Sequence, residues 1–168
     1  YIADVSGHGA SSAFVTVLLK NFSRRLRREY KPKMLREPGE ILAALNRELL
    51  DNRLDKHVAL FIGVIDLVDD TLSFANGGHL PAAILSDAAG CRFLELSGKP
   101  VGLFEGVTWV SDHVALRGAL MLAMASDGVL EMMGPGSLAE KEQRLLDAVR
   151  TAHAKGGELW HVLGLDQR

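Results

Sequence analysis

Two acidic residues stand beside glycine-rich turns, in positions from which they could bind a metal ion. Asp4 follows apolar residues and precedes the turn Ser6 to Gly9, and Asp127 follows a second apolar segment and precedes Gly128. A single aspartate at a strand end is more often a helix cap or a turn former. Two such acids are more informative, because hard divalent cations need oxygen ligands that converge from separate parts of a chain. The pair indicates a site for Mg²⁺ or Mn²⁺.

The sequence gives no comparable pattern for a protein nucleophile. Ser6, Ser126 and Cys91 do not belong to a Ser-His-Asp or Cys-His arrangement. His8 has two interpretations. It could act as a general acid, since histidine titrates near neutral pH, or it could simply hold the turn through hydrogen bonds to the backbone. The chemistry is therefore expected to depend on the two aspartates.

Helical periodicity marks both ends of the chain. Between Ser11 and Tyr30 apolar residues recur every four positions, which predicts an amphipathic helix of about five turns. Its predicted buried face consists of Phe14, Leu18, Phe22, Leu26 and Tyr30, with Val17 beside them. After Lys31-Pro32, a second helix is predicted from Pro38-Gly39, with a face of Ile41, Leu42, Leu45 and Leu49. Further helices are predicted for Ser137 to Ala154 and for Glu158 to Leu163.

The middle of the chain has the composition of short strands. Val58 to Leu67 and Thr71 to Ala75 flank Asp69-Asp70, and this arrangement predicts a hairpin. More strands are predicted at Ala82 to Leu85, Cys91 to Leu96, Thr108 to Leu116 and Ala119 to Ala125, with turns at Asp87 to Gly90 and at Arg117-Gly118. Consecutive strands favour antiparallel pairing, and helices at both ends indicate the α+β class.

Composition narrows the class of protein. The 168 residues are 48% hydrophobic and 24% charged, which suits one domain with its own core. A single cysteine excludes an internal disulfide and a cysteine-based zinc site. The longest apolar runs fall short of a membrane span, and the start of the chain lacks the features of a signal peptide. We therefore expect a cytoplasmic domain without membrane contact, cut from a longer protein.

The net charge of −2 argues against a dedicated nucleic-acid binder. Charge is nevertheless uneven, since residues 1–36 contain eight basic and two acidic groups, a sum of +6, and the remainder sums to −8. The basic cluster fits a solvated helix end or a surface that docks an acidic or phosphorylated partner. Binding of nucleic acid by this cluster is a remote third interpretation, which a steep salt dependence of affinity would support.

Four segments together resemble a known family. They are Ala3-Asp4-Val5-Ser6-Gly7-His8-Gly9, Asn76-Gly77-Gly78-His79-Leu80-Pro81, Pro100-Val101-Gly102-Leu103 and Ser126-Asp127-Gly128-Val129-Leu130-Glu131. In this order they are similar to motifs of the SpoIIE/RsbU-type branch of the PPM metal-dependent serine/threonine phosphatases. The resemblance implies an α-β-β-α sandwich, in which two packed antiparallel sheets are flanked by helices, with two metal ions in a cleft.

The resemblance also implies roles for individual residues. Asp4 would bridge two Mn²⁺ or Mg²⁺ ions, the carbonyl of Val5 would be a backbone ligand, and Asp127 would supply a second carboxylate. Asn76 and His79 would either line the site or fix a turn before Pro81, and the turn is favoured. The family's first acidic motif and its final Asp-Asp motif have no counterpart here, so residues 1–168 are expected to be a single domain truncated at both ends.

The implied function is hydrolysis of phosphoserine or phosphothreonine in a bacterial regulatory protein by a metal-activated water. The resemblance implies a phosphorylated anti-sigma-factor antagonist as substrate and an upstream sensory or receiver domain as regulator. The alternative is a non-catalytic module that binds a partner on the same fold. Acids in the two missing motifs of the parent protein would favour the enzyme, and their absence would favour the binding module.

Overall fold

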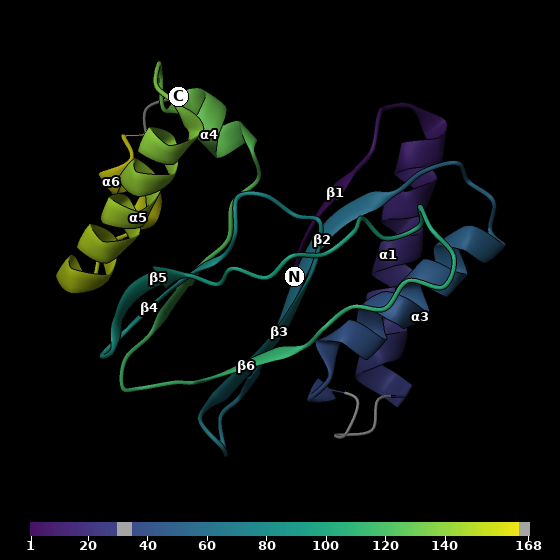
Figure 1. Cartoon of the computed structure of the whole chain (residues 1–168), viewed down its shortest axis with the longest axis horizontal. Helices are drawn as coiled ribbons and strands as arrows, with labels where there is room; N and C mark the ends of the chain where they lie inside the picture. Colours follow the sequence, from purple (N-terminus) through teal and green to yellow (C-terminus); the bar gives the residue numbers. More distant parts are fainter. Residues whose placement is uncertain (30–34, 165–168) are drawn as a thin grey trace. The chain divides into compact units, whose positions relative to one another are not determined.

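Among the described residues, 1–29 and 35–164, seven strands form two antiparallel sheets in a computed structural model (Figure 1). The chain divides into two units, and each unit holds one of the sheets. Unit 1 comprises Tyr1–His79 and Leu96–Ala115, and unit 2 comprises Leu80–Glu95 and Leu116–Arg168. These elements confirm the predicted α+β class.

The sheet of unit 1 is built around a hairpin. Its strand order is β1-β2-β3-β6, and the strands are β1 (Ile2–Val5), β2 (Val58–Asp66), β3 (Thr71–Gly77) and β6 (Asp112–Ala115). The predicted hairpin is confirmed as β2 and β3, which pair from Leu60 with Gly77 to Asp66 with Thr71. On its other edge β2 pairs with β1, so that Asp4 lies opposite Ala59. The first candidate acid is therefore held by the central hairpin of the sheet.

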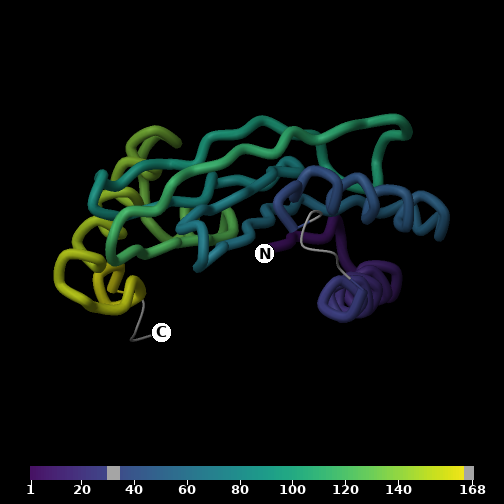
Figure 2. Tube along the Cα trace, turned by 90° about the horizontal axis from the view of Figure 1, so that it is seen from below, coloured from purple at the N-terminus to yellow at the C-terminus, as the bar shows by residue number. Residues whose placement is uncertain are grey.

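Two helices of unit 1 share a hydrophobic core with this sheet. They are α1 (Ala10–Glu29) and α3 (Pro38–Asp51), and Figure 2 shows them next to each other. Gly39 allows α3 to approach the neighbouring loop closely, because a Cβ at this position would meet the carbonyl oxygen of Trp109. The predicted face of α3 is confirmed, since its four members are all buried: Ile41, Leu42, Leu45 and Leu49.

The predicted face of α1 is partly wrong. Leu18 and Phe22 are buried as expected, but Phe14 is 52% exposed and Val17 is 55% exposed. The reason is geometric: each step of four residues turns a helix by about 40° beyond a full turn, so a strict four-residue repeat drifts off one face. The buried face also includes Val15 and Leu19. Tyr30, Lys31 and Pro32, which the sequence placed at the end of this helix, lie outside the described residues.

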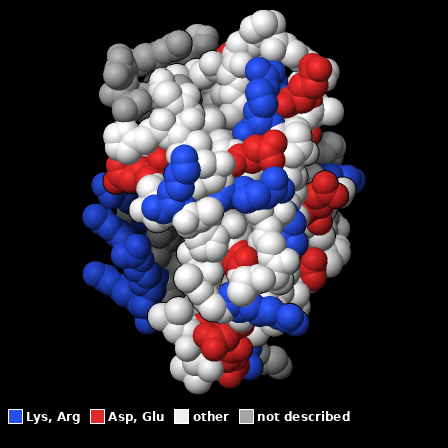
Figure 3. All heavy atoms as spheres, turned by 90° about the vertical axis from the view of Figure 1, so that its left-hand side faces the viewer, with Lys and Arg blue, Asp and Glu red and all other residues white. Residues whose placement is uncertain are grey.

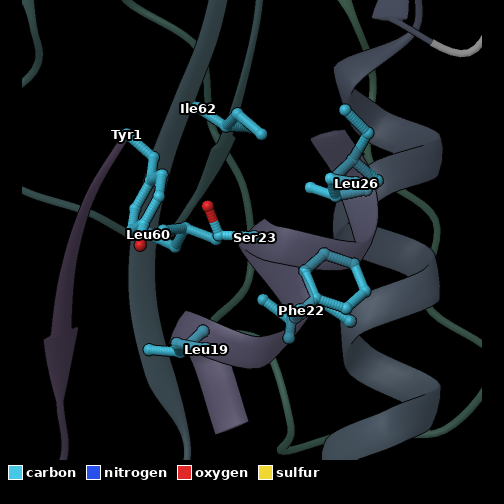
Figure 4. Close-up of a pocket in the computed structure, with 9 residues that line it drawn as sticks. Tyr1, Leu19, Phe22, Ser23, Leu26, Leu60 and Ile62 are labelled. Carbon is cyan, nitrogen blue, oxygen red and sulfur yellow. The ribbon is translucent and has the colours of Figure 1, made fainter. Parts of the chain in front are cut away.

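A small apolar cavity of about 20 Å³ remains between α1, α3, β2 and Tyr1. In Figure 4 the side chains of Leu19, Phe22 and Leu26 on α1 face this space, across from Tyr1, Leu60 and Ile62 on the side of the sheet. Ser23 also lines the cavity. The cavity is close to the size of one water molecule, so α1 packs against the sheet with little free volume.

Unit 2 pairs its sheet with a long helix. Strands β4 (Ile84–Asp87), β5 (Gly90–Phe93) and β7 (Met121–Ala123) have the order β5-β4-β7, and the helices are α4 (Gly128–Met132), α5 (Leu138–Lys155) and α6 (Leu159–Val162). Their core contains Ile84, Leu130, Leu145 and Val149. Helix α5 begins with a capping box between Ser137 and Glu140 and ends at the left-handed Gly156. In Figure 3 basic and acidic side chains alternate over the centre of the face on the side of α5.

Several predicted elements are shorter than expected, and one was missed. The strand predicted from Thr108 to Leu116 is ordered as β6 only from Asp112, because Trp109 is held in a loop by a 2.8 Å hydrogen bond from its indole N–H to the carbonyl oxygen of Lys99. Helix α4 was not predicted, since it has only five residues and begins with glycine. In the described part of the chain, no helix combines the length and the apolar character that crossing a membrane requires.

Two phenylalanines on α1 test the observed face directly. We predict that Phe22→Ala lowers the free energy of unfolding by about 3–5 kcal/mol, because Phe22 is 8% exposed and its removal leaves a cavity. Phe14→Ala is the matched control and should change stability by about 0.5 kcal/mol or less. Urea unfolding of the 168-residue chain measures both. Equal losses for the two variants would contradict the assigned face.

Asp87 is a buried carboxylate that closes the turn between β4 and β5. Its side chain is fully buried and accepts hydrogen bonds from the Arg92 guanidinium at 3.2 Å and from the Ala89 backbone N–H at 2.9 Å. Burial alone raises the pKa of Asp87, but these donors outweigh burial and hold the pKa below its usual value. The ionised Asp87 therefore stabilises the folded state fully when the pH is above the pKa that Asp87 has in the unfolded chain. This stabilisation is lost as the pH falls through the lower pKa that Asp87 has in the folded chain.

We predict that Asp87→Asn lowers the free energy of unfolding at pH 7 by about 1–3 kcal/mol, because a charge-assisted pair is replaced by a weaker one. The difference between variant and wild type should shrink as the pH falls below about 4, because the unfolded chain then takes up a proton at Asp87 that the folded carboxylate still resists. Urea unfolding between pH 3 and 7 measures this convergence. A difference that stays constant over the whole range would show that the charge of Asp87 is not what stabilises the turn.

Candidate functional site

Asp4 and Val5 lie at the end of β1, immediately before the turn that leads into α1. Asp4 is exposed, and Val5 pairs with Val58 of β2. Gly7 and Gly9 have φ values of +70° and +93°, which glycine adopts without steric cost. Sequence reasoning predicted this strand-turn-helix arrangement, and the structure confirms it.

The turn is fastened to the segment before β2 by paired hydrogen bonds. The backbone N–H of Ser6 donates to the carbonyl oxygen of His57 at 2.9 Å, and the backbone N–H of His57 donates to Ser6 Oγ at 3.0 Å. The hydroxyl of Ser12, in the first turn of α1, donates to the carbonyl oxygen of Ser6 at 3.2 Å. We call the reciprocal pair the Ser6–His57 clamp. It fixes the backbone two residues after Asp4.

The sequence did not reveal the clamp, although it contained one signal. That signal is the position of Ser6, since a serine that directly follows a strand commonly bonds to backbone groups. Its partner is 51 residues away in the sequence, and the partner's contribution comes from its backbone. A backbone partner leaves no mark on residue type, so periodicity and motif spacing could not identify it.

Asn76 fixes the turn that follows β3. Its side-chain oxygen accepts a 2.8 Å hydrogen bond from the backbone N–H of His79, and its side-chain amide donates to the carbonyl oxygens of His79 and Leu96 at 3.2 and 2.8 Å. The favoured interpretation of Asn76 as a turn residue is therefore confirmed. The hydrogen bond from Asn76 to Leu96 was not predicted. It joins the turn to the loop that carries Pro100, Val101 and Gly102.

A second asparagine, Asn46, holds that loop from the other side. Its side-chain oxygen accepts a 2.7 Å hydrogen bond from the backbone N–H of Gly102, and its amide donates to the carbonyl oxygen of Phe104 at 3.0 Å. Val101 forms two backbone hydrogen bonds with Val58 of β2. This contact lies just beyond the last pair between β2 and β3, which is Leu60 with Gly77. Val58 thus contacts the Asp4 strand on one side and the Val101 loop on the other. Sequence reasoning missed Asn46 because a single polar residue within a predicted helix, here between Leu45 and Arg47, gives no sign that it is buried.

Asp127 lies in unit 2, between β7 and α4. It is exposed and occupies the position before the first helical residue. Its backbone carbonyl accepts hydrogen bonds from Leu130 at 2.8 Å and Glu131 at 3.2 Å, but its side chain makes no capping hydrogen bond. The side chain of Asp127 therefore does not cap the helix, which is the simplest structural role for an aspartate at this position. Its carboxylate is available for a ligand.

The predicted ligands offer oxygen atoms, which suit a hard cation, but only two of them are carboxylates. Among hydrogen bonds and ion pairs within residues 1–29 and 35–164, none engages the carboxylate of Asp4 or of Asp127. Exposed carboxylates are the ligands that Mg²⁺ and Mn²⁺ favour. Asp4 and Val5 are neighbours in unit 1, while Asp127 belongs to unit 2. The described residues contain no group of three or more His, Cys, Asp or Glu side chains that could hold a metal ion.

Comparison with known proteins supports the class that the fold indicates. The structure is similar to the RsbU and RsbW domains of Rv1364c from Mycobacterium tuberculosis, with a TM-score of 0.72 and 20% identity over 96% of this chain and 43% of that one. At this identity the likeness establishes the fold alone. The α+β architecture with two antiparallel sheets is therefore that of an RsbU-like domain.

Sequence comparison then gives the family. The family model for stage II sporulation protein E (SpoIIE) matches residues 1–163, so the chain belongs to the SpoIIE family. The chain is 28% identical over 132 residues to phosphoserine phosphatase RsbP of Bacillus subtilis, covering 77% of this chain and 32% of RsbP. It is 29% identical over 104 residues to protein IcfG of Synechocystis, covering 62% of this chain and 16% of IcfG. The resemblance to the SpoIIE/RsbU-type branch is thus confirmed, and the chain spans a third or less of these relatives.

The Ser6–His57 clamp can be tested without any assumption about activity. We predict that Ser6→Ala lowers the free energy of unfolding by about 1–3 kcal/mol, because the backbone N–H of His57 loses its acceptor in a partly buried place. Ser11→Ala, which changes an exposed serine of α1, is the matched control and should alter stability by about 0.5 kcal/mol or less. Urea unfolding and amide hydrogen exchange at His57 measure the effect. Unchanged exchange in Ser6→Ala would contradict the clamp.

Proposed function

We propose that the chain is the catalytic part of a metal-dependent protein phosphatase that hydrolyses phosphoserine or phosphothreonine. The observation that carries this proposal is the pair of aspartates without side-chain partners in the described segments, Asp4 before the Gly7–Gly9 turn at the end of β1 and Asp127 before Gly128 at the start of α4. Membership of the SpoIIE family and similarity to a phosphatase named for phosphoserine support it. Because the family match runs through both units, we propose that they form one phosphatase domain.

The ligands of the proposed site are the carboxylates of Asp4 and Asp127 and the backbone carbonyl of Val5. When bound there, two Mn²⁺ or Mg²⁺ ions would lower the pKa of a coordinated water and neutralise charge on the phosphoryl oxygens. The chain's own contribution is to hold these oxygen ligands in place. The backbone of Asp4 is fixed by its pairing with β2 and by the Ser6–His57 clamp, so this backbone needs little reorganisation when a metal binds.

The substrate that we propose is a phosphorylated bacterial regulatory protein, specifically an antagonist of an anti-sigma factor, and the proposed location is the cytoplasm. Support comes from the similarity to RsbP and to the RsbU and RsbW domains of Rv1364c. We further propose an upstream sensory or receiver domain in the full-length protein. Its presence can be read from the complete gene.

A non-catalytic binding module remains the second candidate function. The described segments contain no group of three or more His, Cys, Asp or Glu side chains that could hold a metal ion, and this observation favours the alternative. The two functions differ in one measurable respect. A binding module would retain the phosphorylated partner unchanged, whereas a phosphatase would release inorganic phosphate from it.

We predict that Asp4→Asn abolishes Mn²⁺-dependent phosphate release from a phosphoserine protein by the full-length gene product. Asparagine keeps the shape of the side chain but removes the negative charge that a carboxylate would supply to a divalent cation. Asp127→Asn should reduce the same rate, with a smaller loss if other ligands retain the metal. Phosphate release is measured with and without Mn²⁺, and circular dichroism checks that the fold is intact.

Asp112→Asn is a suitable control, because Asp112 is an exposed aspartate of the same unit as Asp4 and lies on β6. It should leave the Mn²⁺-dependent rate unchanged. Near-normal turnover by Asp4→Asn, with the usual dependence on Mn²⁺, would exclude Asp4 as a metal ligand. A wild-type protein that releases no phosphate under any metal condition would favour the binding module.

A further inference from the structure

A hollow of about 470 Å³ lies next to the Asp4 turn and was not part of the predicted site. Its walls come from the end of α3, from the loop between α3 and β2, and from the start of the loop after Val101. Four leucines line it, Leu49, Leu50, Leu54 and Leu103, together with the charged or titratable residues Arg53, Asp55, Lys56 and His57. All of these residues belong to unit 1.

The hollow shares a wall with the turn that holds Asp4. His57 lines the hollow with its neighbours, and its backbone forms the clamp with Ser6. Gly102 also lines the hollow, and a Cβ at this position would lie 3.0 Å from both Leu49 Cβ and the carbonyl oxygen of Lys56. In Figure 1 the loop between α3 and β2 leads directly into the strand that pairs with β1. A ligand in the hollow would therefore lie beside the proposed phosphatase site.

Lys56 places a positive charge at this shared wall. A methyl group built on Gly7 would lie 2.8 Å from Lys56 Nζ, so the ammonium group rests on the glycine of the Asp4 turn. Of the ion pairs formed within the described segments, none involves Lys56 or Arg53. The two cations are opposed in the hollow by the single carboxylate of Asp55. The wall thus has a net positive charge and an unpaired ammonium group next to the turn.

The backbone that presents these residues is conformationally restricted. Arg53 and Asp55 both have φ of +48°, which is unfavourable for residues other than glycine and needs support from surrounding contacts. The loop starts from the α3 end, where the backbone N–H of Arg53 donates to the Leu50 carbonyl at 3.0 Å, and it ends at the clamp. The loop is therefore held at both of its ends, and this fixes the backbone position of Lys56.

We propose that this hollow binds the phosphoserine-bearing segment of the substrate protein, with Lys56 contacting the phosphate and the leucines receiving an apolar side chain next to it. A phosphate dianion complements the unpaired ammonium group, and charge-assisted hydrogen bonds of this kind are among the strongest in proteins. Arg53 adds a second cation at the rim. This inference rests on the proposed phosphatase function and adds the recognition of its substrate.

The test measures binding without metal, in the full-length gene product with EDTA present. The probe is a fluorescein-labelled peptide, Gly-Ala-Leu-pSer-Gly-Ala, compared with its unphosphorylated form by fluorescence anisotropy. We expect the wild type to bind the phosphorylated peptide at least about tenfold more tightly, and Lys56→Gln to lose about tenfold in affinity for it. Lys56→Arg should stay within about threefold of the wild type, because it keeps the charge. Lys20→Gln removes one exposed lysine from α1 and should bind as the wild type does.

Arg53→Gln is a second variant that keeps the test decisive if Lys56→Gln does not fold, and it should lose about threefold in affinity. Replacing leucine by serine in the peptide should weaken binding to the wild type. Equal affinity of wild type and Lys56→Gln for the phosphopeptide, including no binding by either, would overturn the proposal. Hydrolysis of p-nitrophenyl phosphate with Mn²⁺ is measured separately in the wild type. Its absence would count against the phosphatase function, whereas the anisotropy values would still decide the role of Lys56.

Discussion

The pairing of β1 with β2 is the constraint on which the rest of unit 1 depends. It places Asp4 opposite Ala59 and ends in the Ser6–His57 clamp, where two backbone N–H groups find acceptors at 2.9 and 3.0 Å. Without this pairing, a four-residue strand followed by a glycine-rich turn would have no fixed conformation. The same β2 residue that ends the pairing, Val58, also bonds to Val101. One strand end thus positions the candidate metal ligand and the loop beside it.

Polar side chains, rather than the hydrophobic core, shape the loops around this strand end. Asn46 and Asn76 are both buried, and together they bond to backbone groups of four other residues: His79, Leu96, Gly102 and Phe104. A buried amide that lost these partners would carry a desolvation cost of about 1–3 kcal/mol. The loops therefore have defined conformations although they lack regular structure. Such preorganisation is what a site needs if its ligands are to meet a metal or a phosphate without rearrangement.

The sequence predicted those parts of the structure that residue type determines locally. The face of α3, the β2–β3 hairpin and the turn after Asp4 follow from periodicity, strand propensity and glycine, and each is present. The buried face of α1 was misjudged at Phe14 because a four-residue repeat only approximates the helical period. The Ser6–His57 clamp and the hollow around Lys56 could not be predicted, since each brings together segments about 50 residues apart in the sequence. Long-range contacts of this kind leave no periodic signal.

The central claim is that Asp4 is a ligand of a divalent cation, and equilibrium binding of Mn²⁺ tests it most directly. Free Mn²⁺ can be followed by its electron paramagnetic resonance signal during titration of the full-length gene product. The account predicts that the wild type removes Mn²⁺ from solution and that Asp4→Asn removes less, at the same degree of folding. Identical titration curves for the wild type and Asp4→Asn would contradict it.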